Sequence, residues 1–92
     1  MKAEGCVAEY CVLLASSAKK ELLRLPDPVI ARILPKIEDL AVEPRPHGCK
    51  KLRGGEDAWR VRVGDYRVIY TVDDREKKVE VTRIAHQREA YE

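Results

Sequence analysis

The stretch Ala58-Trp59-Arg60-Val61-Arg62-Val63-Gly64-Asp65-Tyr66-Arg67-Val68-Ile69-Tyr70-Thr71-Val72 contains two alternating runs joined by Gly64-Asp65. Glycine at the first position of a two-residue loop is typical of a type II′ turn, whose twist matches that of paired antiparallel strands. Because side chains alternate along a strand, counting outward from the turn fixes the register. The predicted pairs are Val63 with Tyr66, Arg62 with Arg67, Val61 with Val68, and Trp59 with Tyr70.

This register places two kinds of side chain on opposite faces of the hairpin. The apolar face carries Trp59, Val61, Val63, Tyr66, Val68 and Tyr70. The opposite face carries Arg60, Arg62 and Arg67. Like charges directly opposite each other in a ladder repel, so Arg62 facing Arg67 indicates either a fully solvated face or a site for an anion.

The charge of the chain is concentrated around this hairpin. The whole chain of 92 residues has a formal net charge of +2, but residues 45–70 alone contain seven Lys or Arg against three acidic residues. A local basic cluster is typical of a protein that binds a polyanion. Arginine predominates in it, and the planar guanidinium binds phosphate oxygens in pairs. We therefore expect the anion to be a phosphate.

Composition narrows the remaining possibilities. Cys6, Cys11 and Cys49 are odd in number and lack a CxxC spacing, so we expect reduced thiols, no disulfide framework and no metal site. We expect no cofactor. No apolar run approaches the roughly 18 residues that a membrane span requires. The length fits one domain over residues 1–92, and we expect a cytoplasmic protein.

The first half of the chain predicts a strand followed by two helices. Residues 10–14 form a short apolar run, and their length favours a strand. Ser16 or Ser17 is expected to cap a helix over residues 18–24. Asp27 is expected to cap a second helix, with Pro28 in its first turn, and apolar residues at helical spacing continue to residue 41.

The second half predicts antiparallel strands. Two prolines and a glycine indicate a loop over residues 43–48, and a strand is expected to begin at Lys50. After the central hairpin, a four-residue turn at 73–76 and a strand over 77–84 would set Val79 against Tyr70 and Val81 against Val68. The predicted fold class is α+β: an N-terminal strand and a helical hairpin packed on one face of a twisted, mainly antiparallel sheet.

Three segments together resemble the RelE/ParE superfamily of toxins from toxin–antitoxin pairs. They are Lys51-Leu52-Arg53-Gly54-Gly55, the run from Trp59 to Tyr70 with its Gly-Asp-Tyr-Arg-Val-Ile-Tyr core, and Arg83-Ile84-Ala85-His86-Gln87-Arg88-Glu89-Ala90-Tyr91. The resemblance covers nearly the whole chain and implies a RelE-like fold. It also implies a metal-independent endoribonuclease that enters the ribosomal A site and cuts mRNA through attack by the RNA's own 2′-hydroxyl.

Such cleavage needs a base for the 2′-hydroxyl proton, positive charge around the phosphate, and an acid for the departing 5′-oxygen. By resemblance, Arg67 contacts the scissile phosphate, and its neighbour Arg62 could share this role. Arg60 and Arg62 stand where RelE has two lysines. Arginine stays protonated and is a poor base, so the proton acceptor has to be found elsewhere.

The C-terminal segment offers the remaining candidates for chemistry. We favour His86 for proton transfer, because imidazole gives or takes a proton near neutral pH, although a surface histidine is the alternative. Tyr91 matches a family tyrosine that stacks on a base or orients the 2′-hydroxyl, and its alternative role is core packing. Either Arg88 or Gln87 occupies the place of a further RelE arginine.

The other basic residues are expected to hold the RNA backbone, where charge matters more than geometry. These RNA-binding candidates are Lys50, Lys51, Arg53 and Arg88. Trp59 lies on the apolar face and is expected to pack in the core rather than stack on a base. His47 is expected to be solvated, and a carboxylate base from Glu56 or Asp57 is a weaker alternative.

Two other functions fit the same resemblance. One is a ParE-like toxin that inhibits DNA gyrase and cuts no RNA. The other is a toxin relic that only binds its partner, which is suggested by arginines at both lysine positions. The toxin readings imply a cognate antitoxin whose flexible segment covers the basic face, and the nuclease reading adds the ribosome and mRNA as partners.

Overall fold

A computed structural model describes residues 10–52 and 58–86 of the chain. The chain forms five strands and two helices in the described part. In chain order they are β1 (Cys11–Leu14), α1 (Ser16–Leu23), α2 (Asp27–Asp39), β2 (Lys50–Lys51), β3 (Ala58–Val63), β4 (Tyr66–Asp73) and β5 (Lys78–His86).

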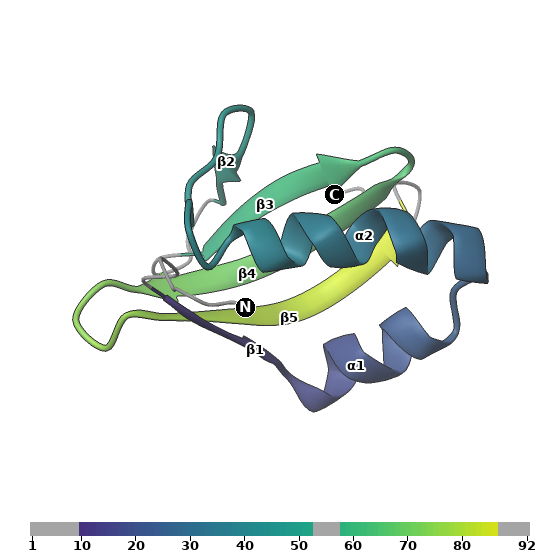
Figure 1. Cartoon of the computed structure of the whole chain (residues 1–92), viewed down its shortest axis with the longest axis horizontal. Coiled ribbons are helices and arrows are strands. Elements are labelled where there is room, and N and C mark those ends of the chain that lie inside the picture. The colour runs from purple at the N-terminus through teal and green to yellow at the C-terminus, as the bar shows by residue number, and fades with distance from the viewer. Residues whose placement is uncertain (1–9, 53–57, 87–92) are drawn as a thin grey trace, which may run out of the picture.

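The strands form one sheet in the order β1-β5-β4-β3-β2. β1 runs parallel to β5, whereas the other neighbours are antiparallel. Both helices lie on the same side of this sheet (Figure 1). This architecture confirms the predicted α+β class, with the helical hairpin on one face of a mainly antiparallel sheet.

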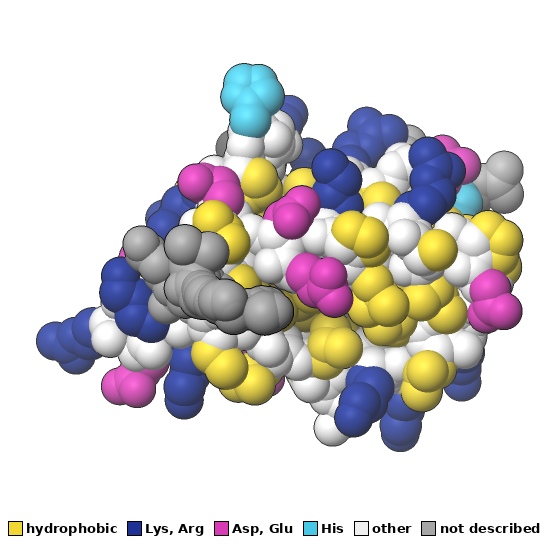
Figure 2. Space-filling model, viewed as in Figure 1, with side chains coloured by type: hydrophobic (Ala, Val, Ile, Leu, Met, Phe, Trp, Pro, Cys, Tyr) yellow, Lys and Arg dark blue, Asp and Glu magenta, His cyan; other side chains and the backbone are white. Residues whose placement is uncertain are grey.

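The core lies between the two helices and the apolar face of the sheet. The helices contribute Ala18, Leu22, Ile33, Ile37 and Leu40, and the sheet contributes Val63, Val68, Tyr70, Val72, Val79, Val81 and Ile84. In β4 the buried side chains are every second residue, as expected for a strand with one covered face. Figure 2 shows hydrophobic side chains over and between α1 and α2, with Lys and Arg around the outline.

The helices begin earlier than the capping residues predicted. α1 starts at Ser16 with Ala15 as its N-cap, and α2 starts at Asp27 with Pro26 as its N-cap. Neither N-cap forms a side-chain hydrogen bond. The predicted capping roles of Ser16, Ser17 and Asp27 are therefore wrong, because all three residues lie inside their helices. The Ser17 hydroxyl donates to the Thr82 carbonyl of β5 instead (3.0 Å).

The β3–β4 hairpin has the predicted register at every position. Val63 pairs with Tyr66, Arg62 with Arg67, Val61 with Val68, and Trp59 with Tyr70. Gly64, the first of the two loop residues, has φ +62°, as a type II′ turn requires at that position. The local turn chemistry was therefore sufficient to set this pairing.

The β4–β5 register differs from the prediction. The loop has four residues as expected, but it lies one residue later, because Asp73 pairs with Lys78. Tyr70 consequently pairs with Val81 and Val72 with Val79, not Tyr70 with Val79 and Val68 with Val81. This two-residue shift keeps both valines on the core face, which is why hydrophobic alternation did not reveal it.

A β-bulge at Thr82 interrupts the same pair of strands. Ile69 pairs with Arg83 and Tyr70 with Val81, which leaves Thr82 as the extra residue. The Thr82 hydroxyl donates to the Ile69 carbonyl (3.2 Å). Beyond the bulge the alternation reverses, so that Ile84 pairs with Val68 and faces the core.

Helix α1 supports β5 at this bulge, where β1 no longer lies beside it. β1 pairs with β5 only as far as Val81. Past that point the Glu21 carboxylate accepts the Ile84 backbone N–H (2.7 Å) and the Arg83 Nε–H (3.3 Å). A carboxylate on a helix thus satisfies a backbone donor that a neighbouring strand would otherwise satisfy.

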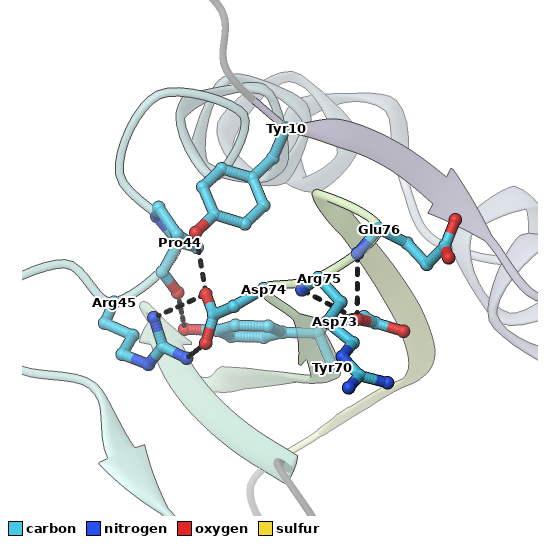
Figure 3. A network of polar contacts seen from close by, with 8 residues as sticks. All are labelled: Tyr10, Pro44, Arg45, Tyr70, Asp73, Asp74, Arg75 and Glu76. Carbon is cyan, nitrogen blue, oxygen red and sulfur yellow. Dashed lines mark hydrogen bonds and ion pairs between the residues drawn. The ribbon is translucent and has the colours of Figure 1, made fainter.

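The opposite end of the sheet is held by a network around Asp74 in the β4–β5 loop (Figure 3). Arg45 donates to both carboxylate oxygens of Asp74 (3.3 and 2.7 Å), and the Tyr10 hydroxyl donates to one of them (2.7 Å). The hydrogen bond from Arg45 holds the pKa of Asp74 below its usual range. Nearby, the Tyr70 hydroxyl donates to the Pro44 carbonyl (2.8 Å), and burial raises the tyrosine's pKa.

Candidate functional site

The predicted arginine face lies on the side of the sheet away from the helices. Arg62 on β3 is directly opposite Arg67 on β4, and Arg60 is directly opposite Lys50 on β2. Cross-strand partners share a face, so four cationic side chains project from the same side of three neighbouring strands. The alternation predicted this shared face for Arg60, Arg62 and Arg67, and the structure adds Lys50 to it.

Arg67 is the more enclosed member of the central pair. Its side chain is half-buried and its Nε is fully covered, whereas Arg62 is exposed. On its other side, Arg67 pairs with Ala85 of β5, which is buried. The strand that carries Arg67 is thus flanked by β3 on one side and β5 on the other, with the small side chain of Ala85 at the paired position.

His86 ends β5 directly opposite Tyr66. The two rings are edge to face, with 5.1 Å between their centroids. The pairing puts His86 on the helix side of the sheet, while Arg67, which pairs with Ala85, projects from the other side. The structure therefore brings His86 and the arginine pair to the same end of the sheet but to opposite faces.

The bulge is the cause of this placement. An unbroken alternation from Val79 and Val81 would turn the side chain of His86 toward the arginine face. The extra residue, Thr82, reverses the alternation, so His86 follows Ile84 onto the helix side.

The candidate RNA-binding residues do not form one surface in the described part of the chain. Lys50 projects from the arginine face, but Lys51 pairs with Trp59 and places its ammonium 6.0 Å from the Trp59 ring centroid. Arg53, Arg88 and Tyr91 lie outside the described residues, as do Gln87, Glu56 and Asp57.

Trp59 packs against the core as the alternation predicted. Its ring is half-buried, and the Arg45 guanidinium lies 5.3 Å from the ring centroid. Arg45 also binds Asp74, so one arginine links the tryptophan to the β4–β5 loop. These contacts give Arg45 a structural role, although it contributed to the basic cluster in the sequence.

A pocket of about 310 Å³ lies between the end of α2 and β3, with Arg62 among its lining residues, and was not predicted from the sequence. It is lined by Lys36, Asp39, Leu40, Pro46, His47, Gly48, Val61 and Arg62. These residues come from the last turn of α2, the turn before β2, and β3. No sequence pattern connects the three segments, since only the packing of α2 against the sheet brings them together.

The described residues contain no group of three or more His, Cys, Asp or Glu side chains that could hold a metal ion. None of the helices in this part of the chain is long and apolar enough to cross a membrane.

Comparison with known proteins gives one family. Residues 12–91 match the model described as the ParE toxin of type II toxin–antitoxin systems, parDE. The chain is also similar to toxin RelE of Mycobacterium tuberculosis, with 34% identity over 84 residues that cover 89% of this chain and 86% of the relative.

Solved structures give the same result. The archaeal RelE–RelB complex from Pyrococcus horikoshii contains a chain that matches this one with a TM-score of 0.78 and 32% sequence identity. The match covers 89% of this chain and 99% of that one. The intact Escherichia coli RelBE toxin–antitoxin complex contains another, with a TM-score of 0.74 and 26% identity, covering 84% and 95% of the two chains.

Proposed function

The chain belongs to the RelE/ParE superfamily of type II toxins, and from this premise we propose that it is a metal-independent endoribonuclease that cuts mRNA in the ribosomal A site. The pairing of Arg62 with Arg67 is the observation that carries the proposal. The two arginines occupy directly opposed positions on one face of the ladder, where one phosphate could accept hydrogen bonds from both guanidinium groups.

In the proposed reaction the RNA supplies its own nucleophile. The 2′-hydroxyl oxygen attacks the adjacent phosphorus, the bond to the departing 5′-oxygen breaks, and a 2′,3′-cyclic phosphate results. Negative charge accumulates on the phosphate oxygens in the transition state, where Arg62 and Arg67 would stabilise it. The half-buried position of Arg67 suits this role, because a held cation needs little reorganisation during the reaction.

Proton transfer is assigned to His86, with Tyr91 orienting the 2′-hydroxyl or stacking on a base. Since His86 lies at the end of β5 on the helix side, an RNA bound to both groups would have to pass around this end of the sheet. Arg60 is assigned to the same phosphate site, and Lys50, Lys51, Arg53 and Arg88 to the RNA backbone.

The proposed partners are a cognate antitoxin, the ribosome and mRNA, and the proposed location is the cytoplasm. Structures of relatives are described as RelE–RelB and RelBE complexes, which supports an antitoxin for this chain. A flexible antitoxin segment would fold over the basic face and exclude RNA from it.

Cleavage on programmed ribosomes tests the proposal. Purified protein is incubated with ribosomes that hold a defined codon in the A site, and the mRNA is mapped by primer extension. We expect A-site cuts that require the ribosome and leave a 2′,3′-cyclic phosphate on the upstream fragment. His86→Gln should alter the pH dependence of the rate, and an unchanged profile would remove His86 from proton transfer.

Inhibition of DNA gyrase is the second candidate, because the matching family model is that of the ParE toxin. The fold does not separate the two functions. A supercoiling assay with the same protein does, since inhibited gyrase together with intact mRNA would replace the nuclease proposal.

A further inference from the structure

The two edges of the sheet are protected to different degrees. β2 forms one edge, and it consists of Lys50 and Lys51 alone. β1 forms the other edge with the sequence Cys-Val-Leu-Leu, which contains no charged residue. Lysine side chains on an edge strand are a common means of preventing that edge from pairing with another chain. The β2 edge therefore has this protection, whereas the β1 edge lacks it.

The backbone groups of β1 that face away from β5 belong to Val12 and Leu14. The Cys11 N–H donates to the Lys77 carbonyl (2.8 Å), and the Ala15 N–H donates in the same way to β5 (2.9 Å). Backbone groups alternate in direction along a strand, so those of Val12 and Leu14 point away from β5. Within the described residues no strand lies on that side of β1. The β1 edge thus offers donors and acceptors at Val12 and at Leu14.

The open part of the β1 edge is limited to these two positions. By the same alternation the Tyr10 N–H also points away from β5, but it donates to the Ala41 carbonyl just after α2 (2.9 Å). At the other end the strand stops at Leu14, and Ser16 begins α1. A strand that pairs with this edge can therefore use outward backbone groups only at Val12 and Leu14.

Apolar side chains lie on both faces of the β1 edge. Val12 and Leu14 pack against the core on the helix side. Because side chains alternate, Leu13 projects from the other face, where it is 44% exposed. Figure 2 shows hydrophobic side chains along the line that β1 takes in Figure 1. An exposed leucine thus lies halfway between the two open backbone positions.

We propose that the β1 edge pairs with the β1 edge of a second copy of this chain, antiparallel and with Leu13 on the two-fold axis. Val12 of each copy then exchanges both backbone hydrogen bonds with Leu14 of the other, and the two Leu13 residues form the pair without mutual hydrogen bonds. No other antiparallel register uses every open backbone group of both edges. The Leu13 side chains contact each other on one face, and Val12 contacts Leu14 on the other.

The symmetry of the edge favours a second copy over an unrelated strand. An edge that meets itself across a two-fold axis has to match its own donors, acceptors and side chains. The β1 edge meets this condition, since its open positions are symmetric about Leu13 and it carries no charge that would face the same charge in the copy. Arg62 and Arg67 lie on β3 and β4, beyond β5 from this edge, so the proposal does not depend on the ribonuclease function.

Sedimentation of the full-length protein in reducing buffer tests the dimer. We expect the sedimentation coefficient to rise with protein concentration, from that of a monomer toward that of a dimer. Leu13→Lys should weaken the association at least about 10-fold, because it places like charges opposite each other at the axis. Leu23→Lys is the matched control, since Leu23 is 73% exposed at the far end of α1, and it should associate like wild type. A monomer at every concentration, or equal association of the two folded variants, would overturn the proposal.

Hydrogen exchange locates the contact within β1. The Val12 and Leu14 amides should exchange more slowly as the protein concentration rises. The Leu13 amide is an internal control, because its N–H points toward β5 and its exchange should not depend on concentration. A dimer in which the Val12 and Leu14 amides exchange as fast as in the monomer would have its interface elsewhere, and the proposal would be wrong.

Leu13→Cys gives a covalent test of the axis. The Cα atoms of an antiparallel pair without hydrogen bonds lie about 4.5 Å apart, within the range of a disulfide. Cys11 faces Ala15 of the second copy, so the two Cys11 residues are separated by about 13 Å along the strand and cannot form one. Oxidation should cross-link Leu13→Cys at position 13 and leave Leu23→Cys without a cross-link at position 23, as peptide mapping by mass spectrometry can show. Equal cross-linking at the two positions would exclude the proposed register.

Discussion

The two hairpins of the sheet share strand β4 but obtain their registers in different ways. The β3–β4 hairpin is closed by Gly64-Asp65 and pairs without interruption to Ala58 and Thr71. The β4–β5 hairpin has a longer loop and a bulge at Thr82, and contacts distant in sequence hold both. A tight turn fixes the first register locally, whereas the second depends on packing.

The difference explains which predictions succeeded. Alternation and a glycine turn were sufficient for the β3–β4 register and hence for the arginine face. In the β4–β5 hairpin the observed loop lies one residue later than predicted. The predicted and the observed registers both bury Val79 and Val81, so burial could not distinguish them. The residue that supports the bulge is Glu21, 63 positions before Ile84, and nothing near β5 in the sequence indicates it.

The first prediction compares an arginine from each hairpin. Arg67→Ala should lower the rate of mRNA cleavage by about 100-fold or more, because it removes a cation placed to stabilise the transition state. Arg75→Ala in the exposed β4–β5 loop should leave the rate unchanged. Single-turnover cleavage on programmed ribosomes measures both, and thermal unfolding checks that both variants fold. Equal rates for wild type and Arg67→Ala would remove Arg67 from the reaction.

The second prediction concerns the support of the bulge. Glu21→Ala should lower the free energy of unfolding by about 1–3 kcal/mol, because it leaves the half-buried Ile84 N–H without its charged acceptor. Glu38→Ala, at an exposed position of α2, should change it little. Urea unfolding measures both variants. If the two lose the same stability, Glu21 does not hold β5 at the bulge.

The third prediction weakens the local turn of the first hairpin. Gly64→Ala should lower the free energy of unfolding by about 1 kcal/mol, because φ +62° brings the new Cβ close to the following carbonyl. The space itself is open, since the nearest atom to that Cβ would be Arg32 Nη1 at 3.9 Å. Urea unfolding again provides the measurement, and a stability unchanged from wild type would contradict the turn assignment.

The fourth and smallest effect is a pH dependence in the loop of the second hairpin. Arg45 and Tyr10 lower the pKa of Asp74 in the folded protein below the ordinary 3.8. The resulting stabilisation is complete above that value and is lost as the pH falls through the folded pKa. Unfolding midpoints measured from pH 6 to pH 2 should therefore decrease less in Asp74→Asn than in wild type. Parallel curves would show that the network adds no stability.

The sequence predicted which arginines share a face, but it did not predict the surroundings of that face. Arg60, Arg62 and Arg67 lie on one face because strand alternation leaves no other choice. The face of His86 depended on a bulge, and the pocket depended on how α2 meets the turn before β2.

The position of β5 has a consequence for synthesis of the chain. β5 lies between β1 and β4, although it comes last in sequence among the five described strands. Within the described residues β1 pairs with β5 alone, so this pairing has to wait until residues 78–81 have left the ribosome. Folding that depends on such distant contacts is slow compared with hairpin formation. The β3–β4 hairpin can therefore form during synthesis before β1 obtains its place at the edge of the sheet.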